Sequence, residues 1–248
     1  MESHVAASSD RLIAGLDFKP SGTGSYVTAA KMVRFPCESA NRFSPQSARL
    51  LRFKLATHGW INPETVRLGF DLKEIGGSNS VTLTTPSALG IFSRCRVIMA
   101  GQVVEDVDFL GRTATMMSKL KPPARVAMET VMNGMGASNA SLVNESGTLQ
   151  AIAQNEARTM IVPLDLLGIF NQHRYIPAGM IANGIVLEIE LNSDPTYATT
   201  GSTQWVIENP VIFLTELTLD SQLQEQYVQR VLSGKALNMS GASVGVVL

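Results

Sequence analysis

Apolar and polar residues alternate along several segments of the chain, a pattern typical of β-strands with one buried face. It is clearest over residues 185–191, where every second residue is aliphatic and Glu188 and Glu190 lie between them. The same alternation runs over residues 51–55 and 66–73. Because successive side chains of a strand point to opposite faces, each segment predicts a half-buried strand.

Turn residues define the ends of further predicted strands. Ala100–Gly101 separates two apolar runs and predicts a tight hairpin between residues 94–99 and 102–107. Asn62–Pro63 predicts a turn before the strand at 66–73, and Asn209–Pro210 a bulge within a long strand. Shorter or less regular patterns predict an extended segment at residues 31–37, strands at 81–83, 158–162 and 204–219, a single helical turn at 165–170 and a loop at 192–201.

Helical spacing of apolar residues appears in only a few places. Residues 108–120 predict a helix that ends at Lys121–Pro122–Pro123, and residues 124–132 predict a second one. Residues 134–150 are small and polar and predict a long exposed loop. Near the C-terminus, Ser221 and Gln224 match a capping box, and the helix that they open ends at Gly234.

The order of these elements predicts an all-β protein built as a single jelly-roll antiparallel β-sandwich of about nine or ten strands. There is no alternation of strands and helices that would indicate a parallel sheet. We divide the chain into an N-terminal arm (1–27), the sandwich (28–234) with a helical and loop insertion (108–150), and a C-terminal tail (235–248). Both ends are mildly apolar and are expected to lie against neighbouring subunits.

Composition narrows the function. Only 17% of the 248 residues are charged, which is consistent with a large core or with surface covered by other chains. The net charge is −1 and the first 30 residues contain only Arg11 and Lys19 as basic residues, so we expect little direct nucleic-acid binding. We expect no signal peptide, no membrane span, and folding in a reducing compartment such as the cytosol.

The candidate chemical groups do not form a recognisable catalytic or metal-binding motif. The histidines (His4, His58 and His173) and cysteines (Cys37 and Cys95) lie far apart and lack metal-ligand spacing. No nucleophile elbow and no phosphate-binding loop is present. We therefore predict no catalytic, cofactor-binding or metal-binding residue, and no enzymatic activity.

The acidic residues have structural interpretations. Glu105 and Asp106 could in principle serve glycoside hydrolysis or calcium binding. We favour Glu105 and Asp108 as residues that oppose the dipole at the start of the predicted helix. Glu188 and Glu190 share one face of their strand, and we expect them to face solvent or basic residues of a neighbour.

The arrangement of elements resembles viral jelly-roll capsid proteins. The resemblance is carried by residues 219–223 with Tyr227, Leu232 and Gly234, and by residues 101–109, which are similar to capsid proteins of small icosahedral viruses. It implies a structural subunit of the virion that folds in the host cytoplasm or nucleus and self-assembles in many copies into an icosahedral shell. It also implies other capsid proteins as further partners. The length suits one jelly roll rather than the double jelly roll of larger shells.

Two alternatives remain open from the sequence. One is a carbohydrate-binding β-sandwich that uses exposed Trp60 or Tyr197, with Trp205 expected in the core. The other is a hydrolase on a jelly-roll scaffold, with a pocket that joins His58 or His173 to carboxylates.

Overall fold

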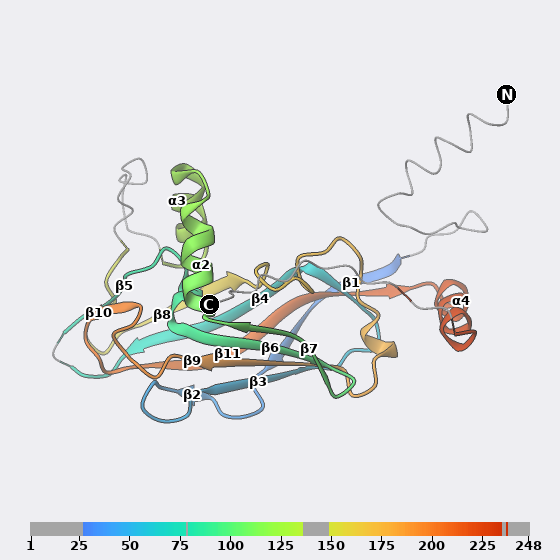
Figure 1. Ribbon diagram of the computed structural model, residues 1–248, viewed down its shortest axis with the longest axis horizontal. Coiled ribbons are helices and arrows are strands. Elements are labelled where there is room, and N and C mark those ends of the chain that lie inside the picture. Colours follow the sequence, from blue (N-terminus) through green and yellow to red (C-terminus); the bar gives the residue numbers. More distant parts are fainter. Residues whose placement is uncertain (1–26, 78, 136–148, 235–236, 238–248) are drawn as a thin grey trace.

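The computed structural model describes residues 27–77, 79–135, 149–234 and 237, which contain eleven β-strands and two layers of sheet (Figure 1). One sheet has the order β1-β11-β4-β8, with β2 paired to β11, and the other has the order β3-β9-β6-β7. A small third sheet joins β10 to β5. The strands are β1 (Val27–Pro36), β2 (Arg42–Phe43), β3 (Leu50–Leu55), β4 (Trp60–Glu74), β5 (Val81–Leu83), β6 (Phe92–Met99), β7 (Gln102–Asp108), β8 (Ala157–Pro163), β9 (Ile185–Leu191), β10 (Thr199–Gly201) and β11 (Trp205–Leu219).

The eight longest strands pair in a nested order. The first pairs with the last (β1 with β11), then β3 with β9, β4 with β8 and β6 with β7, and all of these pairings are antiparallel. This order arises when one long antiparallel hairpin folds over on itself into two facing sheets. It is the strand order of a jelly roll, and the predicted fold class is confirmed.

The core fills the space between the two sheets. In β3 and β9 every second residue is buried, as the alternation predicted. Phe70 of one sheet meets Phe92 of the other edge to face, with ring centroids 5.7 Å apart. Cys95 of β6 and Trp205 of β11 are also buried here, as expected.

In the described part of the chain three α-helices lie outside the sandwich (Figure 1): α2 (Leu110–Lys119), α3 (Pro123–Met132) and α4 (Ser221–Leu232). Two 3₁₀ turns, Ala88–Ile91 and Ala178–Met180, lie in connections. Between β7 and β8, α2 and α3 stand away from the sheets, whereas α4 lies at the far end of the long axis. The base of α2 is fixed because Leu110 and Ala114 are buried in the core.

The hairpin and the long-strand bulge are confirmed. Ala100 and Gly101 both have positive φ, as a tight turn between paired strands requires. In β11 the register shifts between Glu208 and Val211, and Asn209 has a φ of 52°.

The predicted turn at Asn62–Pro63 is wrong, because β4 runs through it. The register places Asn62 opposite Thr215 and Arg67 opposite Phe213, so residues 63–66 bulge from the strand. Thr65 stabilises this bulge: its hydroxyl donates to the Asn62 carbonyl at 2.8 Å and accepts from the Thr215 amide at 2.9 Å. Pro63 is tolerated because a bulge does not require its missing N–H.

Other boundaries also differ from the predictions. Residues 165–170 form successive hydrogen-bonded turns, in which the Asn171 amide donates to the Leu167 carbonyl with the spacing of a helical turn. The loop at 192–201 ends in strand β10. Helix α4 is capped by Asp220, whose carboxylate accepts from the Gln222 amide at 3.3 Å, so the predicted capping box at Ser221 is wrong. A carboxylate one residue earlier already accepts a free N–H of the first turn.

Parts of the predicted organisation lie outside the described residues. These are nearly all of the arm (1–26), most of the tail (235–236 and 238–248) and residues 136–148 of the predicted loop. At the start of that loop Met135 is buried in the core, so the segment is not exposed from its first residues. The helices of the 108–150 insertion are confirmed, with α2 beginning two residues later than predicted.

Candidate functional site

Of the two histidines that the structure describes, His173 lies beside a carboxylate, but on an exposed surface. His58 lies on the surface between β3 and β4. The His173 side chain is 94% exposed and its Nδ1 lies 2.5 Å from Glu64 Oε1, so this contact is on the surface and not in a pocket. Within the described ranges no group of three or more His, Cys, Asp or Glu residues could hold a metal ion, and His4 lies outside those ranges.

The cysteines and tryptophans serve packing. Burial raises the pKa of the Cys95 thiol well above its ordinary value, which disfavours the reactive thiolate. Cys37 Sγ lies 3.2 Å from the Ser39 hydroxyl, in a half-buried position. Trp60 is buried against Tyr227 with ring centroids 5.0 Å apart, so the expectation of an exposed Trp60 for sugar binding is wrong.

Glu105 does not lie at the start of α2, and that interpretation is also wrong. It is a buried residue of β7, and its two carboxylate oxygens accept the amides of Gly168 at 2.8 Å and Ile169 at 3.1 Å. The first turn of α2 contains no acidic residue. Glu105 therefore fixes the connection after β8 to the edge of the second sheet.

Glu74 has a comparable structural role at the end of β4. Its carboxylate accepts the Gly76 amide at 2.6 Å, the Asn155 amide at 3.0 Å and the Ser202 hydroxyl at 2.7 Å. The hydrogen bond from Asn155 is the largest contribution that lowers the pKa of Glu74, to about 2. Three separate connections between strands are therefore hydrogen-bonded to this one carboxylate.

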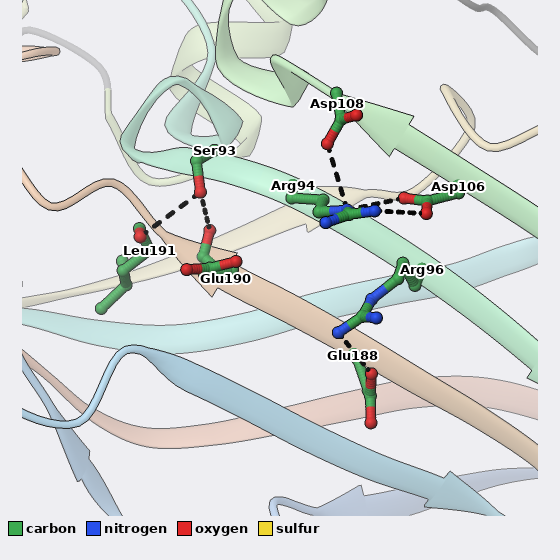
Figure 2. A network of polar contacts seen from close by, with 8 residues as sticks. All are labelled: Ser93, Arg94, Arg96, Asp106, Asp108, Glu188, Glu190 and Leu191. Atoms are coloured by element: carbon green, nitrogen blue, oxygen red, sulfur yellow. Dashed lines mark hydrogen bonds and ion pairs between the residues drawn. The ribbon is translucent and has the colours of Figure 1, made fainter.

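Charged side chains cover the outer face of the β3-β9-β6-β7 sheet (Figure 2). Arg94 of β6 holds Asp106 of β7 through two hydrogen bonds, of 2.8 and 2.6 Å, and its Nε lies 3.1 Å from Asp108 Oδ1. The hydrogen bonds from Arg94 hold the pKa of Asp106 below its ordinary value. Asp108 thus belongs to this network and not to the start of α2.

Glu188 lies between basic residues of two neighbouring strands. Its carboxylate is 3.0 Å from Arg96 Nη2 of β6 and 3.9 Å from Arg52 Nη1 of β3. Glu190 lies 3.8 Å from Arg49. The basic partners of these two glutamates belong to the same chain and not to a neighbouring one, and the network leaves no strong excess charge on this face.

A group that the sequence analysis missed lies where α2 meets the connection between β9 and β10. The Arg112 Nε donates to the Tyr197 hydroxyl at 3.0 Å, and its guanidinium lies 5.5 Å from the Phe109 ring centroid and 5.9 Å from that of Tyr197. Phe109 reaches this position with a left-handed φ of 56°. The contact joins residues 85 positions apart, which helical spacing alone could not indicate.

Large apolar side chains are exposed on the helices. The pair α2–α3 exposes five within 17 residues, and Leu120 and Met132 are 79% and 76% exposed. Helix α4 exposes three more, with Leu232 at 79%. Exposed apolar residues clustered on projecting elements are typical of contact surfaces between proteins. They are Met116, Leu120, Met128, Val131 and Met132 on α2–α3, and Val228, Val231 and Leu232 on α4.

None of the helices in the described ranges is long and apolar enough to cross a membrane.

Comparison with known proteins identifies the fold. The chain matches no described protein family and no curated protein by sequence. It is similar in structure to the PBCV-1 capsid protein VP54 fitted into a reconstruction of the virophage Sputnik, with a TM-score of 0.51 and 13% identity over 86% of this chain and 48% of that one. It is also similar to the Faustovirus major capsid protein, with a TM-score of 0.53 and 9% identity over 86% of this chain and 58% of that one. The chain thus spans about half the length of these proteins and has their jelly-roll fold.

Proposed function

We propose that this chain is a structural subunit of a virus capsid, which assembles with copies of itself into an icosahedral shell. The observation that carries the proposal is the nested eight-strand jelly roll, which the chain has in common with the viral capsid proteins described above. In this role the chain is a repeated subunit of the shell and is located in the virion. We propose other capsid proteins as additional partners.

The surface supports an assembling role. Eight large apolar side chains are exposed on α2, α3 and α4, although the sandwich already has a complete core without them. Burying them against another chain would remove apolar surface from water, which favours association. The arm (1–27) and tail (235–248), defined from the sequence, are proposed to add contacts between neighbours.

The same features favour a role without catalysis or direct genome binding. The buried carboxylates Glu74 and Glu105 are committed to backbone amides and therefore unsuited to act on a substrate. On the outer sheet face, Arg94 and Arg96 are paired with carboxylates, which reduces their availability for phosphates. We propose that the genome is neutralised by something other than this chain.

Sedimentation velocity of the purified chain across protein concentration tests the proposal. We expect large species that increase with concentration and whose formation depends on salt and pH. A chain that stays monomeric at high concentration, under all salt and pH conditions, would overturn the proposal. A monomer that binds a glycan in the same experiment would favour the carbohydrate-binding alternative instead.

A further inference from the structure

The exposed apolar residues of α2 form one stripe with Arg112. Arg112, Met116 and Leu120 are spaced four residues apart, so they lie on the same side of the helix. All three are exposed, and Leu120 directly follows the helix. The stripe therefore presents Arg112 at its base and the apolar Met116 and Leu120 above it, with the exposed Lys119 on the same side of the helix.

The guanidinium of Arg112 is held in place but has no acidic partner. Its Nε is bonded to Tyr197, and the Phe109 and Tyr197 rings lie beside it. Among the described residues no carboxylate forms an ion pair with it. Since its position is already fixed, pairing its remaining N–H groups with a carboxylate would lose little side-chain entropy.

The exposed face of α4 has the complementary pattern. Glu225, Val228 and Leu232 are spaced three and four residues apart and are all exposed, so they form a stripe with an acidic group at its base. Glu225 has no ion-pair partner among the described residues. Both stripes are about 10 to 12 Å long at 1.5 Å per residue.

The two stripes of one chain are far from each other. Helix α4 lies at one end of the long axis, and α2 stands off the sandwich well away from it (Figure 1). One copy therefore cannot join its own stripes, but two copies can.

The α2–α3 surface is also poorly suited to pair with itself. Residues 110–132 contain four basic side chains and one acidic side chain. That acid, Glu129, is already bound to Lys121 at 2.8 Å and to Arg125 at 2.9 Å. Two copies of this surface facing each other would oppose like charges, which disfavours a two-fold contact.

From these observations we propose that α4 of one copy packs in parallel against α2 of the next, with Glu225 paired to Arg112 and Val228 and Leu232 against Met116 and Leu120. This inference rests on the proposed function and specifies one contact between subunits. This contact joins unlike surfaces, so every pair of copies still has one unoccupied α2 and one unoccupied α4. Further copies can therefore add to either side, as in a ring.

Charge reversal tests this contact. Arg112→Glu and Glu225→Arg each place like charges in the contact, so each variant alone is expected to require about tenfold or more protein to assemble. An equimolar mixture of the two should assemble like the wild type. In the mixture each altered α2 can meet an altered α4, and each unaltered α2 an unaltered α4, so alternating copies restore every ion pair in an even-numbered ring and all but one in an odd-numbered ring.

The controls separate this contact from general charge effects and from misfolding. Lys54→Glu makes the same charge change on the exposed face of β3, so it should assemble at the wild-type protein concentration, and in a mixture it should leave the Glu225→Arg copies unassembled. Circular dichroism melting should show that both single variants are folded. The milder Arg112→Gln and Glu225→Gln variants should weaken assembly less than the reversals do.

Two results would count against the account in different ways. If the wild type assembles and both reversal variants assemble equally well, or if their mixture shows no rescue, the α2–α4 contact is wrong while the capsid proposal stands. A wild-type chain that remains monomeric under all conditions overturns the capsid proposal together with this contact.

Discussion

The carboxylate of Glu105, in the middle of strand β7, accepts the amide of Gly168 at 2.8 Å, 63 residues further along the chain. A second oxygen of the same carboxylate accepts the Ile169 amide. This buried group fixes the connection between β8 and β9 to the edge of the second sheet. A carboxyl group can act as a catalytic acid, but the contacts of Glu105 with two backbone amides are those of a structural residue.

Replacing Glu105 with Gln should therefore destabilise the fold. An amide side chain can accept only through one oxygen, so its NH₂ group would face a backbone N–H in the buried site. We expect a loss of about 1 to 3 kcal/mol in the free energy of unfolding, measured by urea denaturation. The exposed Glu38→Gln is the control and should change it little. An equal effect of the two substitutions would contradict the structural role of Glu105.

Glu74 predicts how stability responds to acid. Its pKa is lowered from 4.5 to about 2 in the folded chain, so the folded state favours the ionised form. The resulting stabilisation is complete above about pH 4.5 and is lost as the pH falls toward 2. Glu74→Gln removes the ionisable group, so the wild type should exceed the variant in stability at pH 7 by more than at pH 2.5. A difference that stays constant over this range in urea denaturation would contradict the account.

Replacing Gly111 with Ala should destabilise the fold, although helix propensity alone would favour the substitution. Gly to Ala within a helix ordinarily stabilises a protein by up to about 1 kcal/mol. At Gly111 a methyl group would overlap the backbone carbonyls of Gly90 and Phe92, against which α2 packs. Gly111→Ala should therefore lower the melting temperature, by several degrees in a chain of this size. Lys119→Ala in the same helix is the control and should leave it nearly unchanged. A higher melting temperature for Gly111→Ala would show that α2 does not dock this way.

The network around Arg94 is expected to contribute little to stability. Its side chain is 38% exposed and that of Asp106 33%, so solvent and salt screen their pairing. Arg94→Lys removes the two-point contact and should cost less than about 1 kcal/mol in the free energy of unfolding. A much larger loss in low-salt urea denaturation would mean that this face is essential to the fold.

Local patterns were sufficient to predict the sandwich. Strands such as β3 and β9 are half-buried, and half-burial leaves a period of two in the sequence. The hairpin at Ala100–Gly101 was predictable because a tight turn needs residues that tolerate positive φ. Each of these features depends on residues next to one another in the chain.

Features that depend on distant residues could not be predicted. The bulge after Asn62 requires Thr65 to meet Thr215, and Asp220 caps α4 although Ser221 matches the local motif. The Arg112–Tyr197 contact likewise joins two insertions of the sandwich. The spacing of residues could have pointed to Arg112. Met116 and Leu120 follow it at intervals of four residues, which places large apolar side chains on the polar side of α2.

Electron microscopy of the purified chain is the decisive test of capsid assembly. If the chain is a capsid subunit, the images should show closed shells of uniform diameter built from this jelly roll, with subunits in rings. A field containing only monomers or irregular aggregates, under conditions in which the chain is folded, would contradict it.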